Sequence, residues 1–214
     1  DKKFLQIAFN TIFISLSAGL ICSFIALLIN FSLRLKKTKF IVYLNSFFSI
    51  GYALPGLILA IGILKFFSII DYSFSNFILT GSIFGLLIAY LIKSYALANS
   101  SIESGFSNIS TGIDDSAKIL KSNGWNLLRR IHFPLLKTSF LTSFLLVFTE
   151  VVKELPATLI LRPFNFDTLA VSTYIYAAEE RMYQAATPAI AIVIAGLIPI
   201  IFLSKMIQNS KVNK

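Results

Sequence analysis

Charged side chains within an otherwise apolar stretch are the residues best suited to chemistry in this sequence. The stretch Thr138–Leu161 carries Glu150, Lys153 and Glu154. If the stretch is one helix, spacings of three and four residues place all three charges on one face. Two such carboxylates can form an acid–base pair in an enzyme or offer oxygen ligands to a hard cation. Alternatively, Lys153 neutralises one glutamate and holds helices together, and the sequence leaves these interpretations open.

The remaining reactive residue types indicate no catalytic or metal centre. The chain of 214 residues has a single cysteine, Cys22, and a single histidine, His132. A high-affinity metal site needs several such ligands close together, so we expect none. The sequence also lacks a phosphate-binding glycine-rich loop that ends in Lys-Ser or Lys-Thr. We therefore expect neither a cofactor nor ATP hydrolysis in this chain.

The composition indicates the elements that must hold these charges. Hydrophobic residues make up 56% of the chain and charged residues 14%, against roughly 45–50% and 25% in soluble domains. Several uncharged stretches exceed the ~20 residues that a helix needs to cross a bilayer. We predict an all-α polytopic membrane helix bundle, one domain over residues 1–214, with about five transmembrane helices. The predicted spans are 7–33, 41–64, 73–98, 137–161 and 183–206, and a loop over 99–136 connects the third to the fourth.

The basic residues predict the orientation in the membrane. The net charge is +9, but the basic residues lie at the ends of apolar spans rather than on a continuous polar face, so we expect no nucleic-acid partner. The first connection contains Arg34, Lys36, Lys37 and Lys39. By the positive-inside rule this connection is cytoplasmic, together with the loop over 99–136 and the carboxy terminus. The amino terminus and the connection 162–181 are then external.

The length of the fourth span bears on its charges. Residues 138–149 are uncharged and reach only ~18 Å as a helix, which is too short for a core of ~30 Å. We therefore expect the helix to continue through Glu150, Lys153 and Glu154, with Pro156 bending it towards a cavity. Because isolated charges at this depth are costly, they should pair or face water.

Two short motifs add local detail. Gly51-Tyr-Ala-Leu-Pro-Gly56 lies within the second span, where it can act as a packing kink or a gating bend. In the long loop, Asp114 or Asp115 can begin a short helix that Asn123-Gly124 ends, with Ala117 and Leu120 on one face. A helix of two turns is marginal alone. We expect it to dock on its own neighbours or on a partner protein.

This loop resembles the signature of bacterial ABC-importer permeases. The signature is a Glu-Ala-Ala triplet, a glycine four positions later and an Ile-x-Leu-Pro ending. Asp115-Ser116-Ala117 takes the place of the triplet, Lys121 that of the glycine, and Ile131-His-Phe-Pro134 that of the ending. The resemblance implies that an ATP-binding subunit docks on this loop. The docking residues would be Asp115, Ser116, Ala117, Leu120, Lys121, Gly124, Ile131 and Pro134.

A second resemblance is more specific. The run Lys153–Ala170, followed by Glu179-Glu-Arg181 and the last span, is similar to the carboxy-terminal half of the ferric-iron ABC transporter permeases. It implies the type I ABC importer permease fold in the bacterial inner membrane, a dimer of ATP-binding subunits, a periplasmic iron-binding protein and a second permease half. The translocation path would include Glu150, Lys153, Glu154 and Pro156, and the external loop Arg162, Asn165 and Asp167.

Two alternatives remain from the sequence. Type I permeases for sulfate, thiamine or a phosphonate share the loop signature, so the cargo can differ from ferric iron. A channel or an intramembrane enzyme that uses Glu150 and Glu154 is a function of another class.

Overall fold

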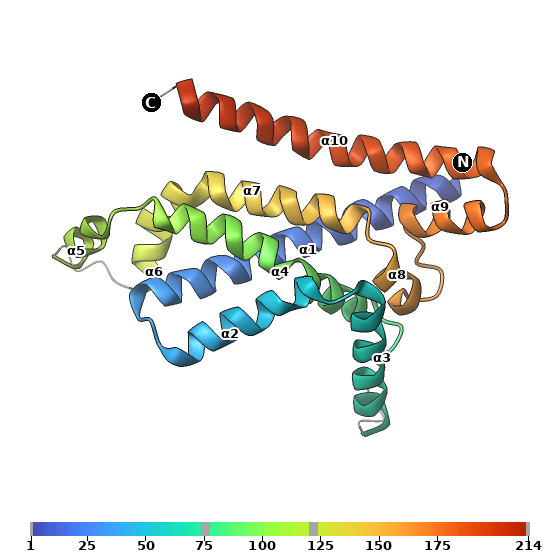
Figure 1. Ribbon diagram of the computed structural model, residues 1–214, viewed down its shortest axis with the longest axis horizontal. Helices are drawn as coiled ribbons and strands as arrows, with labels where there is room; N and C mark the ends of the chain where they lie inside the picture. The colour runs from blue at the N-terminus through green and yellow to red at the C-terminus, as the bar shows by residue number, and fades with distance from the viewer. Residues whose placement is uncertain (1, 74–77, 120–123, 213–214) are drawn as a thin grey trace.

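The computed structural model describes residues 2–73, 78–119 and 124–212, and within them the chain is built of helices (Figure 1). The helices are α1 (Lys2–Leu35), α2 (Lys39–Ile50), the 3₁₀ turn η1 (Gly51–Ala53), α3 (Gly56–Ser73), α4 (Ile83–Ser107), α5 (Thr111–Ile119), α6 (Gly124–Leu127), the π-helical turn η2 (Leu128–His132), α7 (Phe133–Val152), α8 (Pro156–Leu161), α9 (Leu169–Ala178) and α10 (Met182–Val212).

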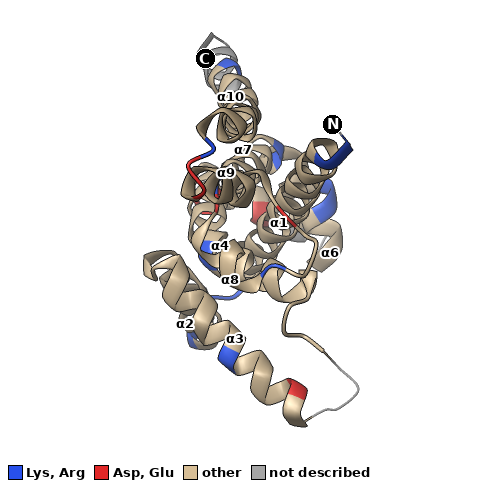
Figure 2. Ribbon diagram, turned by 90° about the vertical axis from the view of Figure 1, so that its right-hand side faces the viewer, with Lys and Arg blue, Asp and Glu red and all other residues tan. Residues whose placement is uncertain are grey.

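Five segments of the described chain are long and apolar enough to cross a membrane. They are Lys2–Leu35, Gly56–Ser73, Ile83–Ser107, Gly124–Val152 and Met182–Lys205. The predicted all-α membrane bundle with about five long helices is therefore confirmed. Charged residues are sparse along its ribbon, as Figure 2 shows.

The core is formed by α1, α4 and α7, which pack against one another. Small residues allow the close approach: a side chain at Gly19 of α1 would meet Phe144 of α7, and one at Gly105 of α4 would meet Ser139. Figures 1 and 2 place α10 on one side of this core and α2 with α3 on the other. Many apolar side chains of α2, α3 and α10 are exposed, which is expected of surfaces that lipid or another protein covers.

The connections between the helices gather at the two ends of the bundle, in the groups that the charge pattern predicted. Figure 1 shows the connection between α1 and α2, the helix α5 and the carboxy terminus at one end, and the amino terminus with α8 and α9 at the other. The side of the membrane on which each end lies stays a prediction.

The prediction for the second span is wrong. Instead of one helix over 41–64, α2 ends before Gly51 and α3 begins at Gly56, leading away from the end of α2 at a steep angle (Figure 1). The break follows from Pro55, because the residue before a proline is driven out of the helical region. Leu54 accordingly has φ −77° and ψ 131°.

The third span is also shifted, from the predicted 73–98 to Ile83–Ser107. Its start is delayed because Asp71 accepts hydrogen bonds from the backbone N–H groups of Leu79 and Thr80, and Ser82 caps α4. Its end lies further on, at Ser107, where the backbone N–H of Asn108 donates to the carbonyls of Gly105 and Phe106. The loop predicted over 99–136 is consequently shorter, since helix resumes at Gly124.

The fourth span starts and ends earlier than the predicted 137–161. Helical structure is continuous from Gly124 to Val152, with Pro134 in the first turn of α7. Pro134 cannot donate to the carbonyl four residues earlier, and the preceding π-helical turn absorbs that irregularity. The first and last spans agree with their predicted ranges to within a few residues.

Candidate functional site

The charged segment between α7 and α8 is a break in the helix. The helix α7 ends at Val152, which is the residue whose carbonyl the ring of Pro156 would strike in a continuous helix. Lys153 and Glu154 lie in the break, and α8 starts at Pro156 itself. The prediction that one helix continues through all three charges is therefore wrong.

The three charges also separate in space. Lys153 Nζ lies 3.0 Å from a carboxylate oxygen of Glu150, so of the interpretations that the sequence left open, Lys153 neutralises one glutamate. Lys153 is mostly exposed, whereas Glu154 turns inward and is only 6% exposed. The predicted single stripe does not form, because the chain changes direction between Lys153 and Glu154.

Glu154 has a partner on another helix. Its Oε2 atom lies 2.5 Å from Nζ of Lys93 on α4, and its Oε1 atom accepts a hydrogen bond from the backbone N–H of Ala157. Both carboxylate oxygens are thus occupied, so Glu154 does not offer free oxygen ligands to a hard cation. Thr158, one turn into α8, adds a 2.6 Å hydrogen bond to the hydroxyl of Tyr90 on α4.

Lys93 is the residue that sequence reasoning missed. It lies within the predicted third span, 73–98, but no role was predicted for it. The signal that could have identified it is the run 94–102, which is again uncharged. A lone lysine with apolar sequence on both sides lies inside a helix and requires a buried partner of opposite charge.

The elbow between α2 and α3 packs directly on this ion pair. A Cβ atom added at Gly56 would lie 2.9 Å from Oε1 of Glu154 and 3.0 Å from Nζ of Lys93. At Gly51 it would lie 2.3 Å from the carbonyl oxygen of Ile92. The packing role of this motif is confirmed, and a gating role stays a prediction. Two broken helices therefore meet at one buried ion pair.

The residues predicted to dock a partner have different environments. Ala117 is 2% exposed and belongs to the chain's own core, so it does not offer an apolar face to a partner. Asp115 and Ser116 are exposed. Leu120 and Lys121 lie outside the described residues, as does the predicted helix end at Asn123.

The rest of the predicted loop signature belongs to the helix that leads into α7. Gly124, with φ +52°, begins α6 instead of ending α5. Ile131 is partly buried and Pro134 is exposed. The most exposed apolar side chains among the described residues of this region are Ile119, 82% exposed, and Trp125, 58% exposed. Neither was predicted as a docking residue.

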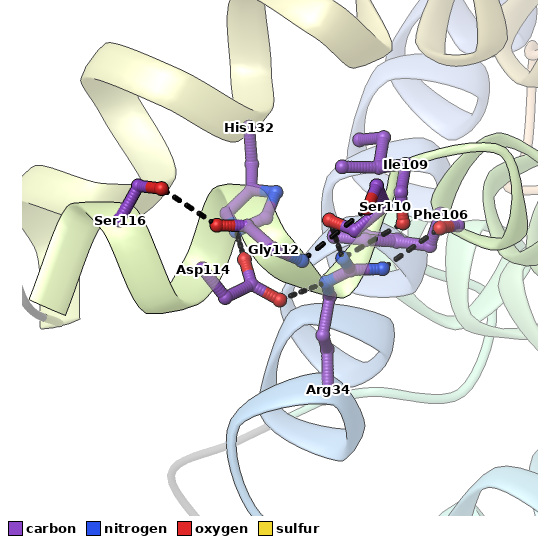
Figure 3. A network of polar contacts seen from close by, with 8 residues as sticks. All are labelled: Arg34, Phe106, Ile109, Ser110, Gly112, Asp114, Ser116 and His132. Atoms are coloured by element: carbon purple, nitrogen blue, oxygen red, sulfur yellow. Dashed lines mark hydrogen bonds and ion pairs between the residues drawn. The ribbon is translucent and has the colours of Figure 1, made fainter.

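The helix α5 starts at Thr111, so the prediction that Asp114 or Asp115 caps its start is wrong. The hydroxyl of Ser110 accepts a hydrogen bond from the N–H of Gly112, which satisfies one free donor of the first turn. Asp114 instead points away from the helix end, towards Arg34 and His132 (Figure 3). Arg34 Nε donates to Asp114 Oδ2 at 2.7 Å.

Within the predicted external loop, two oppositely charged side chains pair with each other. Arg162 forms an ion pair with Asp167, and Asn165 has φ +60°, a left-handed turn that asparagine tolerates. A cavity of about 440 Å³ opens beside these residues. The connection is not a simple loop, because α9 follows it, capped by Thr168 and packed against α1 and α10.

Among the residues that the structure describes, no three His, Cys, Asp or Glu side chains gather as a metal site would require. What the arrangement offers is two interrupted membrane helices that meet beside a buried ion pair between α4 and the break after α7. At one end of the bundle it also offers a short helix beside exposed apolar side chains.

Comparison with known proteins places this arrangement in a family. Residues 16–210 match the family described as binding-protein-dependent transport system inner membrane component. The Fe(3+)-transport system permease protein FbpB 2 of Haemophilus influenzae is 26% identical over 205 residues, which are 95% of this chain and 39% of that protein. The chain thus spans well under half the length of this relative. The putative 2-aminoethylphosphonate transport system permease protein PhnV of Salmonella typhimurium is 26% identical over 194 residues, 89% of this chain and 71% of that protein.

Solved structures share the fold. A crystal structure of a bacterial alginate ABC transporter, in complex with an alginate pentasaccharide-bound periplasmic protein, contains a chain that superposes with a TM-score of 0.76 at 14% identity. The match covers 96% of this chain and 78% of that one. Since the family match covers most of the sequence and the fold agrees, the chain belongs to the family of binding-protein-dependent transport system inner membrane components.

Proposed function

We propose that this chain is the membrane-spanning permease subunit of a binding-protein-dependent ABC importer, driven by ATP hydrolysis on a partner subunit. The observation that carries the proposal is the family match over residues 16–210. The five long apolar helices and the short helix α5 at one end of the bundle support it.

The proposed path for cargo follows the polar positions of α4 and the helix breaks beside it. From the Lys93–Glu154 pair, α4 continues to Asn99 and Glu103. A cavity of about 450 Å³, lined in part by Asn30, Asn45 and Glu103, opens between α1, α2 and α4. Polar side chains at this depth are costly and usually serve a pathway or a fixed contact.

For the cargo we propose ferric iron in a chelated form, because one relative is named as a ferric-iron permease. The pairing of Glu154 with Lys93 and of Glu150 with Lys153 leaves no free carboxylate at the break between α7 and α8. Such a neutralised break suits a chelate better than a naked trivalent ion, whose charge would need compensation. A 2-aminoethylphosphonate is the second candidate, since the relative PhnV has the same identity.

The partners follow from the same assignment. A dimer of ATP-binding subunits would dock at the end that carries α5 and Trp125, and a periplasmic binding protein at the end that carries Arg162, Asn165 and Asp167. A second permease half, on this or another chain, and the lipid of the bacterial inner membrane would cover the exposed apolar faces of α2, α3 and α10.

The cargo proposal is tested with the assembled transporter in proteoliposomes. We expect the periplasmic binding protein loaded with ferric iron to stimulate ATP hydrolysis, and the same protein offered 2-aminoethylphosphonate to leave the basal rate unchanged. Stimulation by the phosphonate alone would establish the second candidate. Transport of cargo in the absence of ATP would contradict the proposal of an ATP-driven importer.

The docking proposal makes a separate prediction. Ile119 is 82% exposed, so Ile119→Arg should leave the fold intact and place a charge in the contact with the ATP-binding subunit. We expect the subunit to be lost during co-purification from detergent. Phe164→Arg, at an exposed position of the opposite end, is the control and should retain it. Equal retention by both variants would rule out docking at Ile119.

The proposed orientation predicts the accessibility of single cysteines. Lys37→Cys, in the connection between α1 and α2, should react with a membrane-impermeant thiol reagent only from the cytoplasmic side, and Asn165→Cys only from outside. Both positions are exposed at their end of the bundle, whereas the native Cys22 is buried and should not react. Labelling of Asn165→Cys from inside would contradict the orientation.

A further inference from the structure

The helix α5 is held to the bundle chiefly by polar contacts. It has nine residues, and a helix of this length is unstable without tertiary contacts. Ala117 is its deeply buried apolar side chain, while Ile119 is almost fully exposed. A single buried alanine side chain makes too few contacts to fix the orientation of a helix. The contacts that fix α5 must therefore come chiefly from its polar side chains, among them Asp114, which accepts a 2.7 Å hydrogen bond from Arg34.

Arg34, in the last turn of α1, gathers three segments around its guanidinium group (Figure 3). Its Nε donates to Asp114 of α5, its NH1 to the carbonyl of Phe106 at the end of α4, and its NH2 to the carbonyls of Ile109 and Ser110. The last carbonyls of a helix have no partner within it. Arg34 thus satisfies carbonyls at the end of α4 and in the connection to α5, and at the same time binds the Asp114 side chain of α5.

His132 closes the arrangement from the other side. Its Nε2 lies 2.9 Å from Oδ1 of Asp114, at ion-pair distance though without the alignment of a hydrogen bond. The imidazole is fully buried, with the rings of Phe31 on α1 and Phe106 on α4 each 5.5 Å away. Asp114 is therefore held between α1 and the π-helical turn that leads into α7.

We propose that Arg34, Asp114 and His132 form a joint that makes α5 move as one body with the ends of α1 and α4 and the start of α7. This inference rests on the proposed function, in which an ATP-binding subunit docks at α5. A displacement imposed on α5 is then delivered to three core helices at once. The three residues are positioning residues: they hold α5 to the membrane helices and so transmit the motion of the partner to them.

Arginine is required at this joint because of its geometry. The planar guanidinium offers five N–H donors in fixed directions, whereas lysine offers one compact charge. Arg34→Lys keeps the charge but cannot reach Asp114 and the three carbonyls together. Asp114→Asn keeps the shape of the side chain and removes the charge that attracts Arg34. Both variants should therefore loosen α5 and leave the bundle assembled.

The first test measures the number of cargo molecules transported for each ATP hydrolysed, using the complete reconstituted transporter. Residues that couple two sites typically change the coupling by about two- to thirtyfold, and we expect a decrease in this range for Arg34→Lys and Asp114→Asn. Lys36→Ala, an exposed position in the same connection, is the matched control and should keep the wild-type ratio. A wild-type ratio in both variants would overturn the proposal.

The second test does not depend on transport. Spin labels attached to Lys36→Cys and Ser116→Cys, in a Cys22→Ala background, report the distance between the end of α1 and α5. We expect a narrow distribution in the otherwise unchanged protein and a broad one in Arg34→Lys. A distance distribution that stays narrow in Arg34→Lys would overturn the proposed joint. If the unchanged transporter moves no cargo with ATP, the proposed function fails, while the spin labels still decide whether the joint exists.

Discussion

Replacing Glu154 with glutamine is expected to destabilise the folded protein by about 3–5 kcal/mol, the usual cost of removing one partner of a buried ion pair. Glu154 is 6% exposed and lies 2.5 Å from Lys93, so Glu154→Gln leaves a buried ammonium group without its counter-charge. Gln keeps the size of the side chain and the acceptor for the N–H of Ala157. The loss should appear as less folded protein in the membrane and a lower melting temperature in detergent.

The double variant Lys93→Met/Glu154→Gln separates this structural role from a role in transport. It removes both charges and keeps the aliphatic volume of the lysine, so we expect most of the lost stability to return. If Glu154→Gln alone folds and accumulates normally but transports slowly, the pair acts in the cargo path instead. Glu150→Gln is the matched control, because its partner Lys153 is exposed and can be solvated.

Replacing Gly51 with alanine is expected to cost about 3 kcal/mol, the upper part of the range for overpacking a core. The added Cβ would lie 2.3 Å from the carbonyl oxygen of Ile92. That atom is backbone within α4, so relief requires a shift of the helix that also carries Lys93. The variant should lower both the folded yield and the melting temperature.

Gly62→Ala is the control from the adjoining helix α3. Nothing lies within 4 Å of a Cβ added there, and alanine is favoured over glycine in a helix by about 0.5–1 kcal/mol. We therefore expect Gly62→Ala to be neutral or stabilising. An equal loss of stability in Gly51→Ala and Gly62→Ala would show that the elbow is not closely packed on α4.

The helix boundaries show how far local sequence information extends. The first and last spans were predicted to within a few residues, because long uncharged runs with charges beyond their ends have one physical solution in a bilayer. The second, third and fourth spans were misplaced. In the second and fourth spans a proline broke a helix that was predicted to continue through it, and in the third the start was delayed by the backbone hydrogen bonds that Asp71 accepts from Leu79 and Thr80.

The contacts at the candidate sites also divide into those that sequence spacing could predict and those that it could not. The pairing of Glu150 with Lys153 was predictable because three residues along a helix fix their distance. The partner of Glu154 was not, since Lys93 lies 61 residues away along the chain. Likewise, the pattern around Ala117 indicated an apolar face, but burial of that face in the chain's own core became evident only in the assembled bundle.

The sequence by itself therefore determined the class of this protein: an all-α membrane bundle, with its basic residues near the ends of its spans, and the family to which it belongs. Composition and short-range spacing suffice for these features, because the bilayer requires long apolar helices and penalises charges within them. The tertiary structure alone decided the contacts of Lys93 with Glu154 and of Arg34 with Asp114. Residues far apart in the sequence meet there because α1, α4 and α7 pack closely, and a buried charge must find its partner wherever the fold places one.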